Sequence, residues 1–158
     1  MDLLEGKIKD FIVMLNEMNG DSFLDTDLQL FWDWYCARNA NAALLLIHMD
    51  QTGRYGRVSL DSDDRVLHFS EKDPQGPPGW INGGIYLVRR HLIESIPEGI
   101  PVSLEKEIFS SRIGQKLFGY PSQGRFIDIG TPETYAVKEA FFDGKIPNAK
   151  KPVCRARS

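Results

Sequence analysis

The sequence predicts an α/β domain in which helices flank a mixed sheet. Residues 10–15 (DFIVML) and 42–49 (AALLLIHM) are short apolar runs of the kind that form buried strands. Between them, residues 25–39 repeat apolar side chains at intervals of three and four, which is the helical period. Strand, helix and strand in this order form the unit that builds parallel sheets with right-handed crossovers.

Composition indicates one globular domain. The chain has 158 residues, of which 42% are apolar and 26% charged, close to globular averages. A net charge of −3 argues against a nucleic-acid binder, which needs a basic face. Cys36 and Cys154 match no metal or redox spacing, as expected in a reducing cytoplasm. No apolar run approaches about 18 residues, so we expect no membrane span and a cytoplasmic protein.

The middle of the chain has the alternating polarity that predicts antiparallel strands. Residues 57–61 and 66–72 alternate in polarity around a polar turn, which predicts a hairpin. A Gly/Pro-rich loop follows at 73–79. Residues 80–90 (WINGGIYLVRR) predict another strand, and their paired glycines indicate a bulge or a close backbone approach.

The last third of the chain is expected to contain both helices and strands. A helix is predicted from Ser103 to Gly114, followed by short strands at 116–122 and 125–130. Thr131-Pro132-Glu133 begins a final helix with proline at its first position. We therefore expect an ordered domain over 1–144 and a basic, solvated tail over 145–158.

An acidic cluster, MNGDSFLDTDL (18–28), follows the first strand. Asp25 or Asp27 can cap the following helix, where negative charge is favoured by the helix dipole. Asp21 fits capping poorly, because it stands at the carboxyl end of the strand, where ligands bind in open α/β sheets. From spacing alone, a structural and a ligand-binding role for Asp21 both remain open.

Three further stretches carry candidate chemistry. FIDIGTPETY (126–135) contains Asp128, a carboxylate that is costly to bury unless it is paired or binds a cation, and with Asp21 it could share one Mg²⁺. In FSEKD, Glu71 and Lys72 suit a sugar hydroxyl and a phosphate, although an exposed charge pair is the simpler interpretation. The glycines of TGRYGRV and INGGIY serve turns and bulges, or let a ligand lie against the backbone.

Taken in order, these stretches resemble the sugar-1-phosphate nucleotidyltransferase family. The motifs are NGDSFLDTDL, TGRYGRV, FSEKD, INGGIYLVRR, SLEKEIF and FIDIGTPETY, and the likeness runs from about Asp10 to about Phe142. It is closest to the guanylyltransferase branch, the mannose-1-phosphate and D-glycero-D-manno-heptose 1-phosphate guanylyltransferases. The resemblance implies a mixed, Rossmann-like sheet of the nucleotide-diphospho-sugar transferase type.

The resemblance also implies an activity and a site. The family transfers a nucleotidyl group, here expected to be GMP from GTP, to a sugar 1-phosphate and releases pyrophosphate. Asp21 and Asp128 would hold Mg²⁺, and these two residues with Lys72 are the expected catalytic residues. The residues expected to line the sugar site are Tyr55, Gly56, Glu71, Lys72, Asn82, Gly83 and Glu105.

One family element has no counterpart in this sequence. Family chains normally begin with a glycine-rich G-G-x-G-T-R-L loop and a Pro-Lys element, which bind the triphosphate, so we expect only the C-terminal portion of the domain here. The LNEM segment (15–18) also lengthens the approach to Asp21. Three explanations stay open: a fragment or truncated gene model, a second copy or partner chain that completes the sheet, or a non-catalytic sugar-phosphate-binding or interaction module.

Overall fold

The computed structural model describes residues 11–15, 22–97, 99, 102–130, 132–136 and 138–143. Three predicted features lie outside the described residues: Asp21, most of the LNEM segment, and the basic tail over 145–158. None of the helices in the described part of the chain is long and apolar enough to cross a bilayer.

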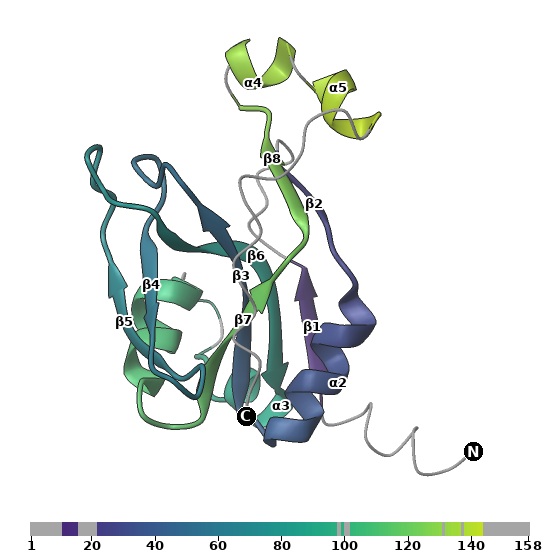
Figure 1. The fold of residues 1–158 in the computed structure, drawn as a ribbon. Coiled ribbons are helices and arrows are strands. Elements are labelled where there is room, and N and C mark those ends of the chain that lie inside the picture. Colours follow the sequence, from purple (N-terminus) through teal and green to yellow (C-terminus); the bar gives the residue numbers. More distant parts are fainter. Residues whose placement is uncertain are drawn as a thin grey trace.

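A six-stranded mixed sheet forms the centre of the molecule (Figure 1). Its order is β5-β4-β6-β3-β7, and β1 pairs with the second half of β6. Both β1 and β3 run antiparallel to β6 and are therefore parallel to each other, while β7 runs parallel to β3. The predicted α/β class is confirmed, with β6 inserted between the two parallel strands. The strands are β1 (Phe11–Leu15), β3 (Ala42–Met49), β4 (Arg57–Leu60), β5 (Val66–Ser70), β6 (Gly79–Arg89) and β7 (Leu117–Ser122).

Strand β3 is buried on both faces, which explains its uninterrupted apolar sequence. Leu44 and Leu46 face a core closed by α3 (Arg90–Glu94) and by η1 (Leu104–Phe109), a π-helix. The alternate side chains of β3 point to the opposite face of the sheet and join a second core. Helix α2 (Leu28–Arg38) closes this core with Phe31 and Tyr35. The sheet is therefore a layer between α2 on one side and α3 with η1 on the other.

The start of α2 resolves the capping alternatives. The carboxylate of Asp27 accepts hydrogen bonds from the backbone N–H groups of Gln29 (2.9 Å) and Leu30 (3.2 Å), so Asp27 is the N-cap. Asp25 lies in β2 (Ser22–Asp25) and instead pairs with Arg125 at 2.7 Å.

The helix predicted over 103–114 is present but wider than expected. Ser103 caps η1 by accepting from the N–H of Lys106, and the 3-10 helix η2 (Ser110–Arg112) follows. The Ser110 N–H and its Oγ (2.9 Å) both donate to the carbonyl of Glu105, five residues back, and these two bonds stabilise the wide turn. The chain leaves the helical segment at Gly114, whose φ is +83°.

The paired glycines of β6 form the predicted bulge. The register passes from Leu44↔Tyr86 to Leu46↔Asn82, so one β3 residue stands opposite three residues of β6. Gly84 has a φ of +75°, and a Cβ on Gly83 would come within 3.0 Å of the Leu45 carbonyl oxygen. Both positions therefore require glycine.

A separate two-stranded ribbon, β2 with β8 (Arg125–Asp128), extends beyond the main sheet (Figure 1). It carries α4 (Pro132–Ala136), which begins with proline as predicted, and α5 (Lys138–Phe142). The ring of Phe23 in β2 packs edge-on against those of Phe141 and Phe142, with centroids 6.0 and 5.0 Å apart. These contacts attach α5 to the ribbon.

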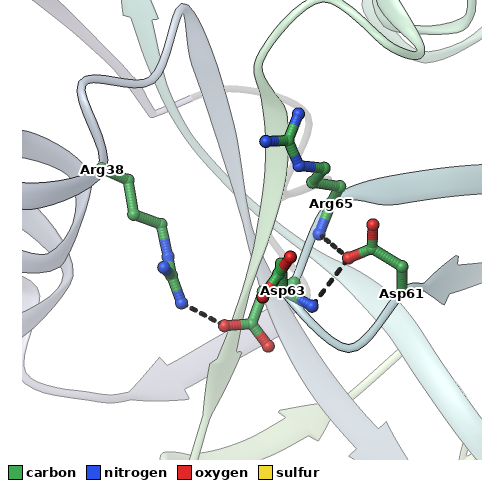
Figure 2. A network of polar contacts seen from close by, with 5 residues as sticks. Arg38, Asp61, Asp63 and Arg65 are labelled. Atoms are coloured by element: carbon green, nitrogen blue, oxygen red, sulfur yellow. Dashed lines mark hydrogen bonds and ion pairs between the residues drawn. The ribbon is translucent and has the colours of Figure 1, made fainter.

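The turn of the β4–β5 hairpin is fixed to α2 by a polar network (Figure 2). One oxygen of Asp61 accepts from the backbone N–H groups of Asp63 (2.8 Å) and Arg65 (2.9 Å). The carboxylate of Asp64 pairs with Arg38 in the last turn of α2, and the Arg38 guanidinium lies 4.4 Å from the centroid of the Trp34 ring. The ion pair thereby fixes the hairpin turn to the end of α2.

Arg38→Ala should lower the free energy of unfolding by about 1–2 kcal/mol, because the part-buried ion pair and the cation–π contact are both lost. Arg90→Ala is the matched control, since its pair with Glu94 is more than half exposed on both sides and should contribute at most about 0.5 kcal/mol. Urea unfolding measures both values. Equal effects of the two substitutions would contradict the structural role given to Arg38.

Candidate functional site

A pocket of about 420 Å³ lies between the hairpin, the bulge of β6 and η1. Its lining is mostly polar, and Val58 and Phe69 contribute apolar side chains. The other residues that line it are Gly56, Arg57, Ser70, Glu71, Lys72, Asn82, Glu105, Lys106 and Ser110. The pocket therefore collects residues from four separate segments of the sequence.

The charges of the pocket are only partly paired. Lys106 Nζ lies 3.7 Å from Glu71 Oε1, and both side chains are largely exposed, so this is a weak surface pair. Lys72, by contrast, makes no ion pair with any residue that the structure describes. A pocket with one unpaired ammonium beside carboxylate and amide groups suits a ligand that has both an anionic group and hydroxyls.

A hydrogen-bonded group of three side chains forms one wall of the pocket. The Asn82 amide nitrogen donates to the Tyr86 hydroxyl (2.6 Å) and to Glu105 Oε1. The Tyr86 hydroxyl in turn donates to Glu105 Oε1 over 3.5 Å, and the Asn82 amide oxygen accepts from the N–H of Gly84 (3.0 Å). Tyr86 is fully buried, whereas Asn82 and Glu105 are half-buried and reach the pocket.

Asp128 lies at the end of β8 and is held by three groups. Its Oδ2 accepts from the Tyr55 hydroxyl (2.6 Å) and lies 3.2 Å from a guanidinium nitrogen of Arg54. Its Oδ1 accepts from the N–H of Gly130 (2.9 Å). The Asp128 side chain is 12% exposed, while that of Arg54 is 51% exposed.

These contacts keep Asp128 ionised. Burial alone raises its pKa, but the hydrogen bond from Tyr55, the bond from Gly130 and the charge of Arg54 together outweigh it. The pKa of Asp128 therefore lies below its ordinary value. A part-buried, ionised carboxylate is the kind of oxygen ligand that Mg²⁺ prefers, although Arg54 occupies the same oxygen.

The structure brings most of the predicted site residues together in two places. Five line the pocket: Gly56, Glu71, Lys72, Asn82 and Glu105. Tyr55, next to Gly56, contacts Asp128 instead. Gly83 packs against β3 and does not line the pocket. Asp21 lies outside the described residues, but its neighbour Ser22 pairs with Asp128 in the β2–β8 register.

Three residues near the site were not singled out from the sequence. Arg54 and Lys106 are ordinary surface cations by sequence, and only the fold places them beside Asp128 and Glu71. Tyr86 stands four residues after Asn82 in an apolar strand. The glycine pair between them, which predicts a bulge, is the sequence signal that could have indicated a contact between the two side chains. Among the described residues no group of three or more His, Cys, Asp or Glu side chains is placed to hold a metal ion.

A second pocket, of about 480 Å³, lies between the start of α2 and the turn after β7. Its two carboxylates are already engaged, Asp25 with Arg125 and Asp27 with the backbone of α2. Burial, and then the charge of Asp27, raise the pKa of Tyr120 on its wall. This pocket holds no cation in its lining and therefore suits an anion less well than the first.

The fold is that of nucleotide-diphospho-sugar transferases. HddC from Yersinia pseudotuberculosis superimposes with a TM-score of 0.70 and 26% identity, over 84% of this chain and 56% of that one. The same protein complexed with GMP-PN gives a TM-score of 0.68.

The chain belongs to the nucleotidyl transferase family, whose model matches residues 4–141. Over 133 residues it is 33% identical to mannose-1-phosphate guanylyltransferase of Mycobacterium tuberculosis, covering 82% of this chain and 36% of that protein. It is 34% identical to D-glycero-alpha-D-manno-heptose 1-phosphate guanylyltransferase of Aneurinibacillus thermoaerophilus, covering 75% of this chain and 51% of the relative. The chain thus spans about half or less of these relatives' lengths.

Tyr55→Phe should raise the pKa of Asp128 toward its ordinary value, because the hydrogen bond that favours the ionised form is lost. Titration of the Asp128 carboxyl carbon by ¹³C NMR measures the shift. Tyr120→Phe is the control, since Tyr120 is not one of the groups that shift the pKa of Asp128. An unchanged pKa in Tyr55→Phe would contradict the geometry.

The same substitution should give a pH-dependent loss of stability. A carboxyl whose pKa is lowered on folding stabilises the native state above its unfolded pKa, and this stabilisation is lost as pH falls through the folded pKa. The difference in unfolding free energy between wild type and Tyr55→Phe should therefore be largest near neutral pH and shrink in acid. Urea unfolding across that range tests the sign.

Proposed function

We propose that this chain takes part in the transfer of a guanylyl group from GTP to a sugar 1-phosphate, giving a nucleotide sugar and pyrophosphate. The observation that carries the proposal is the meeting of Glu71, Lys72, Asn82 and Glu105 in one pocket. Similarity to guanylyltransferases, and to a protein crystallised with GMP-PN, supports the choice of a guanine nucleotide.

The pocket would hold the sugar 1-phosphate. Lys72, which has no carboxylate partner among the described residues, would bind the phosphate, while Glu71 and Glu105 accept hydrogen bonds from sugar hydroxyls. The Gly56 backbone would let the sugar lie close to β4. A phosphate oxygen of the sugar attacks the α-phosphorus of GTP, and the bond from that phosphorus to the β-phosphate oxygen breaks to release pyrophosphate. The protein chiefly positions the reactants and neutralises charge.

Asp128, with Asp21, is our proposed site for Mg²⁺. The lowered pKa of Asp128 and its position next to the β2 strand that follows Asp21 support this role. The ion would neutralise charge on the nucleotide phosphates, and phosphate oxygens and water would complete its coordination. Arg54 would have to leave Oδ2 for the ion to bind there.

The cellular setting and the partner chains are also part of the proposal. We place this chain in the cytoplasm, because its two cysteines match no metal or redox spacing, as expected in a reducing compartment. We also propose that a second copy of the chain or a partner chain extends the sheet. The net charge of −3 gives no support to nucleic-acid binding.

Incubation of the purified chain with GTP, Mg²⁺ and mannose 1-phosphate or heptose 1-phosphate should release pyrophosphate. Lys72→Gln should weaken sugar-phosphate binding by about tenfold or more, because a charge-assisted hydrogen bond is lost. Asp128→Asn should abolish release while leaving sugar-phosphate binding close to wild type. A coupled pyrophosphate assay and calorimetry measure the two quantities.

Lys116→Gln is the matched control, because Lys116 stands in the turn before β7 and does not line the pocket. It should behave as wild type in both measurements. Sugar-phosphate binding without any pyrophosphate release would instead favour a binding module, and absence of both would overturn the proposal.

A further inference from the structure

We propose that Asn82 and Tyr86 are positioning residues that fix one oxygen of Glu105 and leave its other oxygen to accept a substrate hydroxyl. The inference rests on the proposed function and deepens it, since it assigns a selective hydroxyl acceptor within the pocket. It also changes the role expected of Asn82, from a direct ligand of the sugar to a residue that acts through Glu105.

The hydrogen bonds of Asn82 leave its amide without a spare proton. A side-chain amide nitrogen has two N–H groups, and those of Asn82 go to the Tyr86 hydroxyl and to Glu105 Oε1. The amide oxygen accepts from the N–H of Gly84, which fixes which end is oxygen, because an N–H needs an acceptor. Asn82 therefore has no donor left for a ligand.

Tyr86 completes the arrangement from inside the core. Its hydroxyl accepts a hydrogen bond from the Asn82 amide and donates one to Glu105 Oε1, which lies 3.5 Å away. The side chain is 1% exposed and its ring packs against Phe109 of η1, with centroids 5.2 Å apart. Tyr86 does not line the pocket, so its hydroxyl acts on binding through Asn82 and Glu105, which do.

Hydrogen bonds fix Glu105 both at its backbone carbonyl and at its carboxylate. Its carbonyl accepts from the Ser110 hydroxyl, and its Oε1 accepts from two side chains. No hydrogen bond within the described part of the chain involves Oε2. A carboxylate with one oxygen engaged and the other fixed in direction is a selective acceptor, because a ligand without the matching hydroxyl leaves that oxygen unpaired.

The bulge of β6 makes this arrangement available. In a regular strand, residues four apart lie about 13 Å from one another, too far for Asn82 and Tyr86 to bond. The extra residues of β6 opposite Leu45 shorten that separation until the two polar groups meet at 2.6 Å. The glycine pair is thus a requirement for the hydroxyl acceptor as well as for the fold.

The test measures binding of mannose 1-phosphate and heptose 1-phosphate, and of the monodeoxy analogues of the one that binds, by calorimetry with no nucleotide present. Wild type should discriminate against one analogue, the one that lacks the hydroxyl facing Glu105. Tyr86→Phe and Asn82→Ala should each weaken binding of the parent sugar phosphate by about three- to tenfold. Both should also reduce the discrimination against that one analogue.

Two controls separate positioning from packing. Tyr35→Phe removes another buried tyrosine hydroxyl, which donates to the Asn41 carbonyl at 3.3 Å, and should leave binding and discrimination unchanged. In a Glu105→Gln background, Tyr86→Phe should cause no further loss, because its effect passes through the carboxylate. Thermal unfolding of each variant reports any loss of stability.

The outcomes distinguish this inference from the proposed function. If wild type binds no sugar phosphate, the proposed function is wrong, and this inference is overturned with it. If wild type binds and discriminates while Tyr86→Phe and Asn82→Ala do so equally well, only the positioning role is overturned. Additive losses from Tyr86→Phe and Glu105→Gln would also overturn it.

Discussion

The pairing of β6 with β3 is the interaction on which the rest of the molecule depends. β6 is the longest strand, and it contacts β1, β3 and β4, so it joins the parallel unit at the start of the chain to the hairpin in the middle. Its bulge lies opposite Leu45 in the most buried strand of the sheet. Because β3 keeps a regular register with β7 on its other edge, the extra residues all lie in β6, and Asn82 at the bulge lines the pocket.

The two cores have different relations to the proposed site. The core under η1 and α3 includes Tyr86 and Phe109, so the wall of the pocket is continuous with packed apolar side chains. The other core, under α2, reaches the ribbon of β2 and β8 through Leu24 and Phe126. Each candidate group, the pocket and Asp128, is therefore supported by a different layer of the fold.

Much of the fold was predictable from the sequence because its signals are local. The hairpin, the bulge at the glycine pair and the N-cap at Asp27 or Asp25 all follow from neighbouring residues. The insertion of β6 between two parallel strands was not predictable, because strand order depends on contacts far apart in sequence. The π-helical form of 104–109 was missed for a related reason, since it depends on Ser110 bonding the Glu105 carbonyl. The five expected site residues that line the pocket were implied by the resemblance to a family, whereas the positions of Arg54 and Tyr86 beside the site depend on the fold.

Tyr55 and Gly56 are neighbours in the chain but belong to different parts of the site. The hydroxyl of Tyr55 binds Asp128, and Gly56 lines the pocket next to β4. One planar peptide unit joins the two residues, so adjacent backbone positions set the pocket lining and the tyrosine that holds the carboxylate. The chain thus connects the two parts of the site at a single peptide, although their side-chain contacts are separate: the hydroxyl of Tyr55 with Asp128, and the lining of the pocket with its ligand.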